Sequence, residues 1–439
     1  MSRERSWFRS LLRAEDDEVL PLLWSFAYFF CLLCGYYILR PVRDEMAIEG
    51  GVQHLPWMMT ATFFTLLAVT PLFGWLSGRY ARGRLLLGLY TFFAVNLIVF
   101  YALMAHQVLP EWVARVFFVW LSVFNLFVVS VFWSLMADLF TAEQGIRLFG
   151  VIAAGGSTGA LAGPLLTTSL TFVLPIPMLM LVSAIFLVAC MICIYRLDRW
   201  ARRRPQSHPG DNGGPIGGSI LSGIRLAVSS PYLLGICAYL FVLTMSATVL
   251  YLEQTRLISQ EITTAQARTR LFSEMDLITN LLSWLAQVFL TNRLINRFGL
   301  VSALMLLPVV SAVGFSLIGF NQTLLLFLIF TIVRRVGEYA ISKPAREVLF
   351  TVVTREEKYK AKNFIDTAVS RGGDASTGWL VAGVKALGAT TAHLAWMLVP
   401  IMLVWSWLAW FLAQQERRLQ TTKALHDVAS LYGQKNRML

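Results

Sequence analysis

Ionisable side chains lie inside the apolar stretches of this sequence, where their types and spacing could hold a charged solute. A charge within a lipid-spanning segment is costly, so each one is a candidate site residue. Arg40 and Arg43 end the first apolar stretch, and their spacing of three places them on one helical face with Tyr36. Pro41 between them is expected to open the helix locally. The arginines either bind an anion or extend to the lipid headgroups.

Two further groups of candidate residues lie in the later part of the chain. Glu253 and Arg256 end an apolar stretch in the same way as the first arginine pair. Arg371 and Asp374 share a helical face in another stretch. Asp366 lies nearer the inner mouth of that stretch, where we expect it to pair with a lysine that precedes it.

A fourth group, Arg334, Arg335 and Glu338, lies about halfway along an apolar stretch. Glu338 follows the two arginines by four and three residues, so it can pair with either of them. The pairing leaves one positive charge, which favours an anionic ligand. The alternative interpretation is a structural salt bridge that holds the helices together.

Charges beside the apolar stretches have simpler interpretations. Lys343, Arg346 and Glu347 are expected at the inner mouth, with a gating or topological role. Glu274 and Asp276, at the start of another stretch, are expected to form a solvated outer rim.

No pattern in the sequence indicates an enzyme or a metal site. The five cysteines lie in apolar runs without a histidine or acidic partner nearby, and the five histidines are scattered. The run Gly155–Gly159, followed by Gly163, is similar to a phosphate-binding loop, but no lysine follows it and it lies in an apolar helix. Small residues at this spacing let helices approach closely, so we expect a packing role. The sequence predicts no catalytic residue, cofactor or metal.

The elements that position these charges must cross a lipid bilayer. Of the 439 residues, 57% are hydrophobic and 14% are charged, whereas soluble domains carry about 25% charged residues. The formal net charge is +12, which we attribute to basic cytoplasmic loops rather than to nucleic-acid binding. The N-terminal residues lack the apolar run and cleavage site of a signal peptide. The lipid bilayer is therefore an expected partner. The arginines within the apolar stretches add a small anionic solute, and we expect a monomer.

Hydropathy predicts an all-α membrane protein, because a helix needs about 20 apolar residues to cross the hydrocarbon core. Twelve transmembrane helices are expected, at residues 20–40, 56–78, 84–105, 111–137, 146–169, 173–195, 231–252, 271–291, 299–319, 323–342, 363–384 and 392–414. The expected organisation is an N-terminal segment 1–19, a first six-helix half 20–196, a basic linker 197–230, a second half 231–414 and a tail 415–439.

Repeated motifs and the distribution of basic residues predict how these helices are arranged. Ser157–Gly159 recurs as Ser376–Gly378, each in the fifth span of its half, so the halves run in parallel. Most basic residues fall on the side of the N-terminus, which predicts that both termini are cytoplasmic. Gly74–Arg79 resembles the loop signature of the major facilitator superfamily, with Gly78 in place of the usual aspartate. That superfamily has two such halves with a solute site at their interface.

Further motifs extend this resemblance over most of the chain. They are Tyr37–Asp44, similar to Y-x-I-L-R-D-x-K-D; Ser230–Tyr232 and Leu252–Thr255, similar to S-P-Y and L-V-E-x-T; Tyr339, Pro344, Arg346 and Glu347, similar to Y-S-x-x-D-P-x-K-E; and Lys360–Lys362, Ile365 and Asp366, similar to K-G-K-x-x-I-D. These patterns are those of the ATP/ADP translocase family, the nucleotide transporters of plastids and intracellular bacteria. The resemblance implies a secondary transporter, and a bacterial inner membrane as its location.

The chain departs from that family at charges that the resemblance marks as functional. Arg43 stands where the family has a lysine, and the family's glutamate in span seven is kept as Glu253. No acid matches the glutamate of span four, where Asn125 is the polar residue. The lysine of span eleven falls at or near Asp374, with Arg371 one turn earlier.

Three functions remain open from the sequence. The first is an exchanger of nucleotides or similar phosphorylated anions that works by alternating access. The second is a proton-coupled transporter of another organic anion or metabolite, with Asp374, Glu253 or Glu338 carrying the proton. The third is a membrane scaffold or sensor that does not transport.

Overall fold

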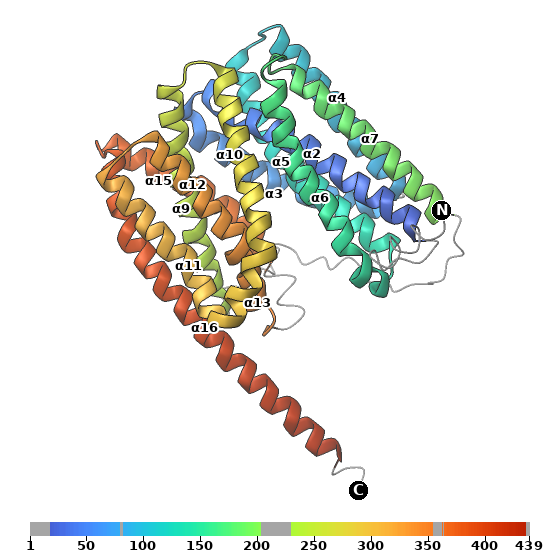
Figure 1. Cartoon of the computed structure of the whole chain (residues 1–439), viewed down its shortest axis with the longest axis vertical. Coiled ribbons are helices and arrows are strands. Elements are labelled where there is room, and N and C mark those ends of the chain that lie inside the picture. The colour runs from blue at the N-terminus through green and yellow to red at the C-terminus, as the bar shows by residue number, and fades with distance from the viewer. Residues whose placement is uncertain (1–17, 80–81, 203–229, 354–361, 363, 436–439) are drawn as a thin grey trace. The chain divides into compact units, whose positions relative to one another are not determined.

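The computed structural model describes residues 18–79, 82–202, 230–353, 362 and 364–435. Within these ranges every regular element is a helix (Figure 1). Most of the predicted linker, and the side chains of several residues in the loop that follows the second span, lie outside this description.

Nine helices of the described part are long and apolar enough to cross a membrane. They are α2 (Val19–Glu49), α3 (Leu55–Arg79), α4 (Arg82–Ala105), α5 (Pro110–Leu139), α6 (Ala142–Leu170), α7 (Met178–Ala201), α9 (Pro231–Glu261), α11 (Asn292–Phe320) and α16 (Thr391–Lys435). α16 is one long helix that continues past the predicted end of the twelfth span at residue 414 (Figure 1).

The three remaining predicted spans are helical but polar or interrupted. They are α10 (Ala265–Ala286) with η2 (Gln287–Thr291), α12 (Leu324–Gly337) with η3 (Glu338–Ser342) and α13 (Lys343–Leu349), and η4 (Ile365–Val369) with α15 (Ser370–Ala386). Each of these three segments, η2, η3 and η4, is a single π-helical turn, a feature that is frequent at functional sites. All twelve predicted spans therefore correspond to helical segments, and the predicted fold class is confirmed.

By contacts between residues, the chain divides into two compact units. The first contains Met1–Asn212 and Thr255–Leu281, and the second contains Gly213–Gln254 and Leu282–Leu439. The division into halves at 20–196 and 231–414 stays a prediction.

A stripe of glycines sets the distance between α6 and α2 in the first unit. A Cβ atom added at Gly159 would lie 2.4 Å from the carbonyl oxygen of Phe30, and one at Gly163 would lie 2.7 Å from that of Cys34. The hydroxyl of Thr167 donates to the Ile38 carbonyl at 3.3 Å, farther along the same contact. The glycine run therefore has the packing role that its spacing predicts.

α2 holds two of the candidate arginines and stays helical through Pro41 from Val19 to Glu49 (Figure 1). The predicted local opening at Pro41 is wrong. The neighbouring helices α5, α6 and α7 all pack against α2 and support it along its length.

In the second unit, the long helix α16 packs along α11. Gly319 of α11 lies against the indole of Trp396, where an added Cβ would come within 2.7 Å of the ring. Gly373 of α15 similarly lies close to Thr244 of α9, where an added Cβ would come within 3.2 Å of the Thr244 side chain. The second contact joins α15 and α9, which carry charged residues of this unit.

Candidate solute-binding residues

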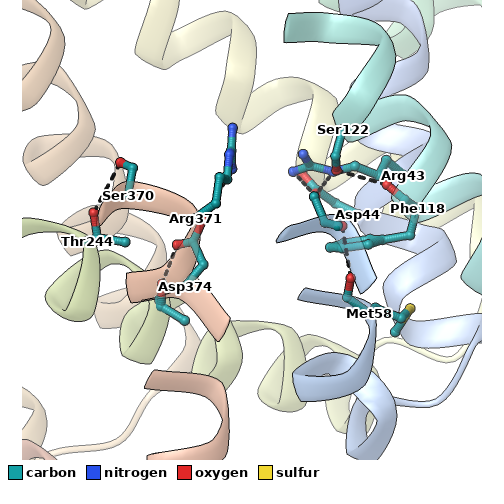
Figure 2. Close-up of polar contacts among 11 residues, drawn as sticks. Arg43, Asp44, Met58, Phe118, Ser122, Thr244, Ser370, Arg371 and Asp374 are labelled. Atoms are coloured by element: carbon teal, nitrogen blue, oxygen red, sulfur yellow. Dashed lines mark hydrogen bonds and ion pairs between the residues drawn. The ribbon is translucent and has the colours of Figure 1, made fainter. Parts of the chain in front are cut away.

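Arg43 lies beside a carboxylate on its own helix. Its Nη2 and Nε donate to Oδ1 of Asp44 at 2.7 and 3.1 Å. The guanidinium also lies 5.3 Å from the ring centroid of Phe118 on α5, a cation–π arrangement. Figure 2 shows this group together with Ser122, which donates to the Phe118 carbonyl. Arg43 is thus a positioned, mostly buried cation whose charge is shared with Asp44.

Arg40, one turn earlier on α2, pairs with an acid of α10. Its Nη1 lies 3.3 Å from Oδ1 of Asp276, and the Asp276 side chain is only 2% exposed. The prediction that Asp276 belongs to a solvated outer rim is wrong, whereas Glu274 is exposed. The reason is rotational: residues two apart on a helix point to different sides, so one faces the packed interior and the other faces outward.

A second α2–α10 ion pair involves two residues that the sequence interpretation missed. Nε and Nη2 of Arg268 donate to the two oxygens of the fully buried Glu45 carboxylate, at 2.7 and 2.6 Å. Arg268 also donates to the carbonyls of Ile262 and Thr263 at 3.1 and 3.2 Å. A bidentate arginine with these further bonds is a well-satisfied buried charge, so removing either partner should be costly.

Arg334 and Glu338 form the predicted pair in the second unit. Nη1 and Nη2 of Arg334 lie 3.1 Å from Oε2 of Glu338, and Arg334 is 3% exposed. Glu338 opens the π turn η3. The guanidinium of Arg335 lies 5.9 Å from the ring centroid of Tyr339. The structure therefore shows that Glu338 pairs with Arg334, the arginine four residues before it.

Arg371 and Asp374 of α15 are also paired, at 3.2 Å between Nη1 and Oδ2. The other carboxylate oxygen of Asp374 accepts from Thr248 of α9 at 2.7 Å. Ser370 and Thr244 join the same two helices at 3.4 Å (Figure 2). Arg371 stays 36% exposed, so its guanidinium can still reach a ligand.

Glu253 is buried and has a cationic partner that sequence reasoning missed. Nζ of Lys385 lies 2.5 Å from Oε1, and the hydroxyl of Thr391 donates to Oε2 at 2.5 Å. Glu253 is 3% exposed. Gln254, the next residue, accepts from Thr331 of α12. The signal for Lys385 in the sequence is a lone lysine in an otherwise apolar run that follows Gly383.

The remaining candidate residues lie on α9 and around α13. Arg256 is half-buried on α9, and on α13 Lys343 is exposed while Arg346 is half-buried. Glu347 pairs with Lys362 at 2.7 Å. The side chain of Asp366 lies outside the described residues, so its predicted pairing with a lysine stays a prediction.

The charged side chains described above form cation–carboxylate pairs in both units. Three bases and three acids meet in the first unit: Arg40, Arg43, Arg268, Asp44, Glu45 and Asp276. The pairs of the second unit likewise contain three bases and three acids: Arg334, Arg371, Lys385, Glu253, Glu338 and Asp374. A solute anion can bind such a cation by replacing its carboxylate.

Apolar spans that carry paired charges in their interior define a multi-pass membrane protein that handles polar solutes. A family model described as Major Facilitator Superfamily matches residues 25–267, more than half of the chain. The chain belongs to the Major Facilitator Superfamily. It is a membrane transporter of that type, not an enzyme.

Similar proteins agree with this assignment and extend it. The chain is 20% identical to "ADP,ATP carrier protein 1" of Chlamydia trachomatis serovar D, covering 91% of this chain and 89% of the relative. The resemblance to the nucleotide translocases is thus confirmed over most of the length.

Solved transporter structures share the fold at low identity. A POT family transporter in complex with a thioalcohol-conjugated peptide matches with a TM-score of 0.63 and 13% identity, covering 90% of this chain and 96% of that one. The nucleoside transporter NupG matches with a TM-score of 0.59 and 13% identity, covering 92% and 99%.

Proposed function

We propose that this protein exchanges nucleotides or similar phosphorylated anions across the membrane by alternating access. The observation that carries the proposal is Arg371, which pairs with Asp374 at 3.2 Å while its side chain stays 36% exposed, so a solute phosphate can reach its guanidinium. Arginine suits phosphate because its planar donors bind two oxygens at once. The similarity to a carrier named for ADP and ATP supports a nucleotide as the solute.

In this proposal Arg40, Arg43 and Arg371 bind phosphate oxygens, and the acids now paired with them act as internal substitutes for the solute. Each carboxylate keeps its arginine neutralised when no anion is bound, since an unpaired cation within the membrane is costly. When the solute binds, each arginine exchanges its ion pair with the carboxylate for contacts with the phosphate oxygens. Arg256, Arg334, Arg335, Glu253 and Glu338 complete the proposed substrate-binding set.

The inner-mouth residues have a gating role in the same proposal. The pair Glu347–Lys362, at 2.7 Å, supports it because such a pair can form and break at little net cost when partly exposed. Lys343, Arg346 and Asp366 are assigned to the same mouth. We further propose a monomer in a bacterial inner membrane, with both termini in the cytoplasm.

A proton-coupled carrier is the second candidate function. The observation that favours it is Glu253, a buried carboxylate held by one lysine and one hydroxyl. In this function Glu253 carries the coupling proton. In this case a pH gradient alone would drive uptake.

Exchange in vesicles separates the two functions. The purified protein is reconstituted with ADP inside, and uptake of labelled ATP is measured with and without the internal nucleotide. We expect uptake that requires internal nucleotide and does not respond to a pH gradient. Uptake into empty vesicles driven by a proton gradient would instead establish the second function.

Variants of the arginines test the site. A charge-assisted contact contributes about 1.5–3 kcal/mol, so Arg43→Ala and Arg371→Ala should each weaken apparent affinity roughly 10- to 100-fold. Arg202→Gln is the matched control, because Arg202 is an exposed arginine at the end of α7 that pairs only with Asp198 in the described residues. Wild-type affinity in both site variants would show that these arginines do not hold the solute.

A further inference from the structure

The first unit contains an apolar groove that the proposed transport function does not use. Side chains of α3, α4 and α5 line it, including Val69, Phe93 and Trp120, and its volume is about 1130 Å³. Pockets for small molecules usually have about 300–1,000 Å³ and contain several polar groups. Here the lining is almost wholly hydrocarbon. A nucleotide or another polar solute would gain little from such a surface.

The groove opens toward the surroundings of the helices rather than into their packed interior. Trp57 of α3, Phe92 of α4 and Val116 of α5 line it and are exposed. α3 packs against α5 more extensively than against α4, which leaves the side between α3 and α4 accessible. All three helices are apolar enough to span the bilayer, so the molecules that surround this opening are lipids.

The titratable side chains of the lining lie at one end of the groove. His54, Trp112 and Arg115 lie there, where η1 (Val52–His54) precedes α3 and where α5 begins. Tryptophans at such positions lie at the headgroup level of a membrane. A groove with a hydrocarbon body and a single basic, aromatic end has the polarity of a phospholipid.

Arg115 has capacity for a further ligand. Its Nε donates to the Gly50 carbonyl at 2.7 Å and its Nη2 to Glu111 at 2.8 Å, while Nη1 makes no hydrogen bond within the described part of the chain. Glu111 is 68% exposed, so this ion pair is weak and can be replaced. The bond to Gly50 orients the guanidinium, which also lies 4.9 Å from the Trp112 ring centroid.

We propose that this groove binds one phospholipid of the surrounding bilayer, with its acyl chains along α3, α4 and α5 and its phosphate at Arg115 and His54. Charge complementarity and the position of the groove in membrane-spanning helices argue for this occupant. The guanidinium and the phosphate form charge-assisted hydrogen bonds, and the chains cover apolar surface that the helices leave open.

Native mass spectrometry of the full-length protein tests the proposal. The detergent-purified protein is stripped of lipid and titrated with palmitoyl-oleoyl-phosphatidylglycerol. Val116→Trp places a large side chain in the groove, and Arg115→Gln removes the phosphate contact. Val313→Trp is the matched control, because Val313 of α11 is a valine with the same 55% exposure as Val116 but lies in the other unit. Thermal unfolding confirms that each variant is folded.

We expect one lipid to bind the wild-type protein and Val313→Trp at least about tenfold more tightly than further lipids, with Arg115→Gln about tenfold weaker. Val116→Trp should lose this tight lipid. Equal lipid binding by wild type and both groove variants would overturn the proposal, as would adducts with the mass of detergent only. Displacement of the lipid by inorganic phosphate at equal concentration would also overturn it, because the acyl chains would then contribute nothing. If Val116→Trp does not fold, an unchanged affinity of Arg115→Gln is sufficient to reject the site.

Discussion

At the scale of single residues, the charged side chains within the spans are organised as pairs. Two of these pairs hold a buried carboxylate: Glu253 pairs with Lys385, and Glu45 pairs with Arg268. In a low-dielectric interior the attraction within a pair offsets desolvation only while both partners are present. Breaking a pair by removing one partner therefore costs more than replacing both.

This asymmetry gives a prediction for the pair that holds Glu253. Lys385→Met leaves a buried carboxylate without its cation, so we expect a loss of stability of about 3–5 kcal/mol, seen as a lower unfolding temperature in detergent. The double variant Glu253→Gln with Lys385→Met should recover most of that loss, because the buried charge is then absent. An unfolding temperature of the double variant as low as that of Lys385→Met would contradict the pairing as the cause.

The same scale shows how far the site could be predicted. The pairs Arg334–Glu338 and Arg371–Asp374 follow from helical spacing alone, since both partners lie on one helix. The partner of Arg40, which is Asp276, could not be found in this way, because it comes from another helix. Its placement depends on the rotation of α10 about its own axis, which local spacing does not give.

At the scale of elements, small residues determine how closely helices approach. Gly159 allows α6 to lie against the backbone of α2, because an added Cβ atom would be so close to the Phe30 carbonyl oxygen that no side chain fits there without movement. Two charge-bearing segments of the second unit instead contain a π turn: η3 begins at Glu338, and η4 directly precedes α15 with Arg371 and Asp374. A π turn shifts the residues that follow it around the helix, so the directions of charges beyond it do not follow the regular period of 3.6 residues.

Two glycines of α6 provide a matched test of the α2 contact. Gly159→Ala puts a methyl group 2.4 Å from the Phe30 carbonyl oxygen and should cost about 1–3 kcal/mol. Gly150→Ala, on the same helix with nothing within 4 Å of the new Cβ, should be neutral or stabilising by about 0.5–1 kcal/mol. Unfolding temperatures in detergent measure both. Equal effects of the two variants would mean that the close approach is not what Gly159 provides.

At the scale of the whole molecule, the distribution of basic residues determines the orientation that we expect in the membrane. Lys and Arg favour the cytoplasmic side, so we expect that side to include both termini. The segment between α2 and α3 is then outside the cell, and the segment between α5 and α6 is inside.

Cysteine labelling checks this orientation. Gln53 of η1 and Glu143 at the start of α6 are both exposed in the structure. In intact cells, Gln53→Cys should react with a membrane-impermeant maleimide, whereas Glu143→Cys should react only after the membrane is permeabilised. Native cysteines give the background, measured on the unmodified protein. The reverse pattern would place both termini outside the cytoplasm.

The sequence by itself determined that this chain is a helical membrane transporter. Apolar length gives the spans, a repeated motif such as Ser157–Gly159 gives the parallel relation, and motifs along the chain give the family, because each of these is a local or periodic property. Only the tertiary structure decided that Lys385 holds Glu253, that Arg268 holds Glu45 and that Asp276 is buried. The physical reason is that pairing between helices depends on how deep each lies and how it is rotated, and packing of the whole unit determines both.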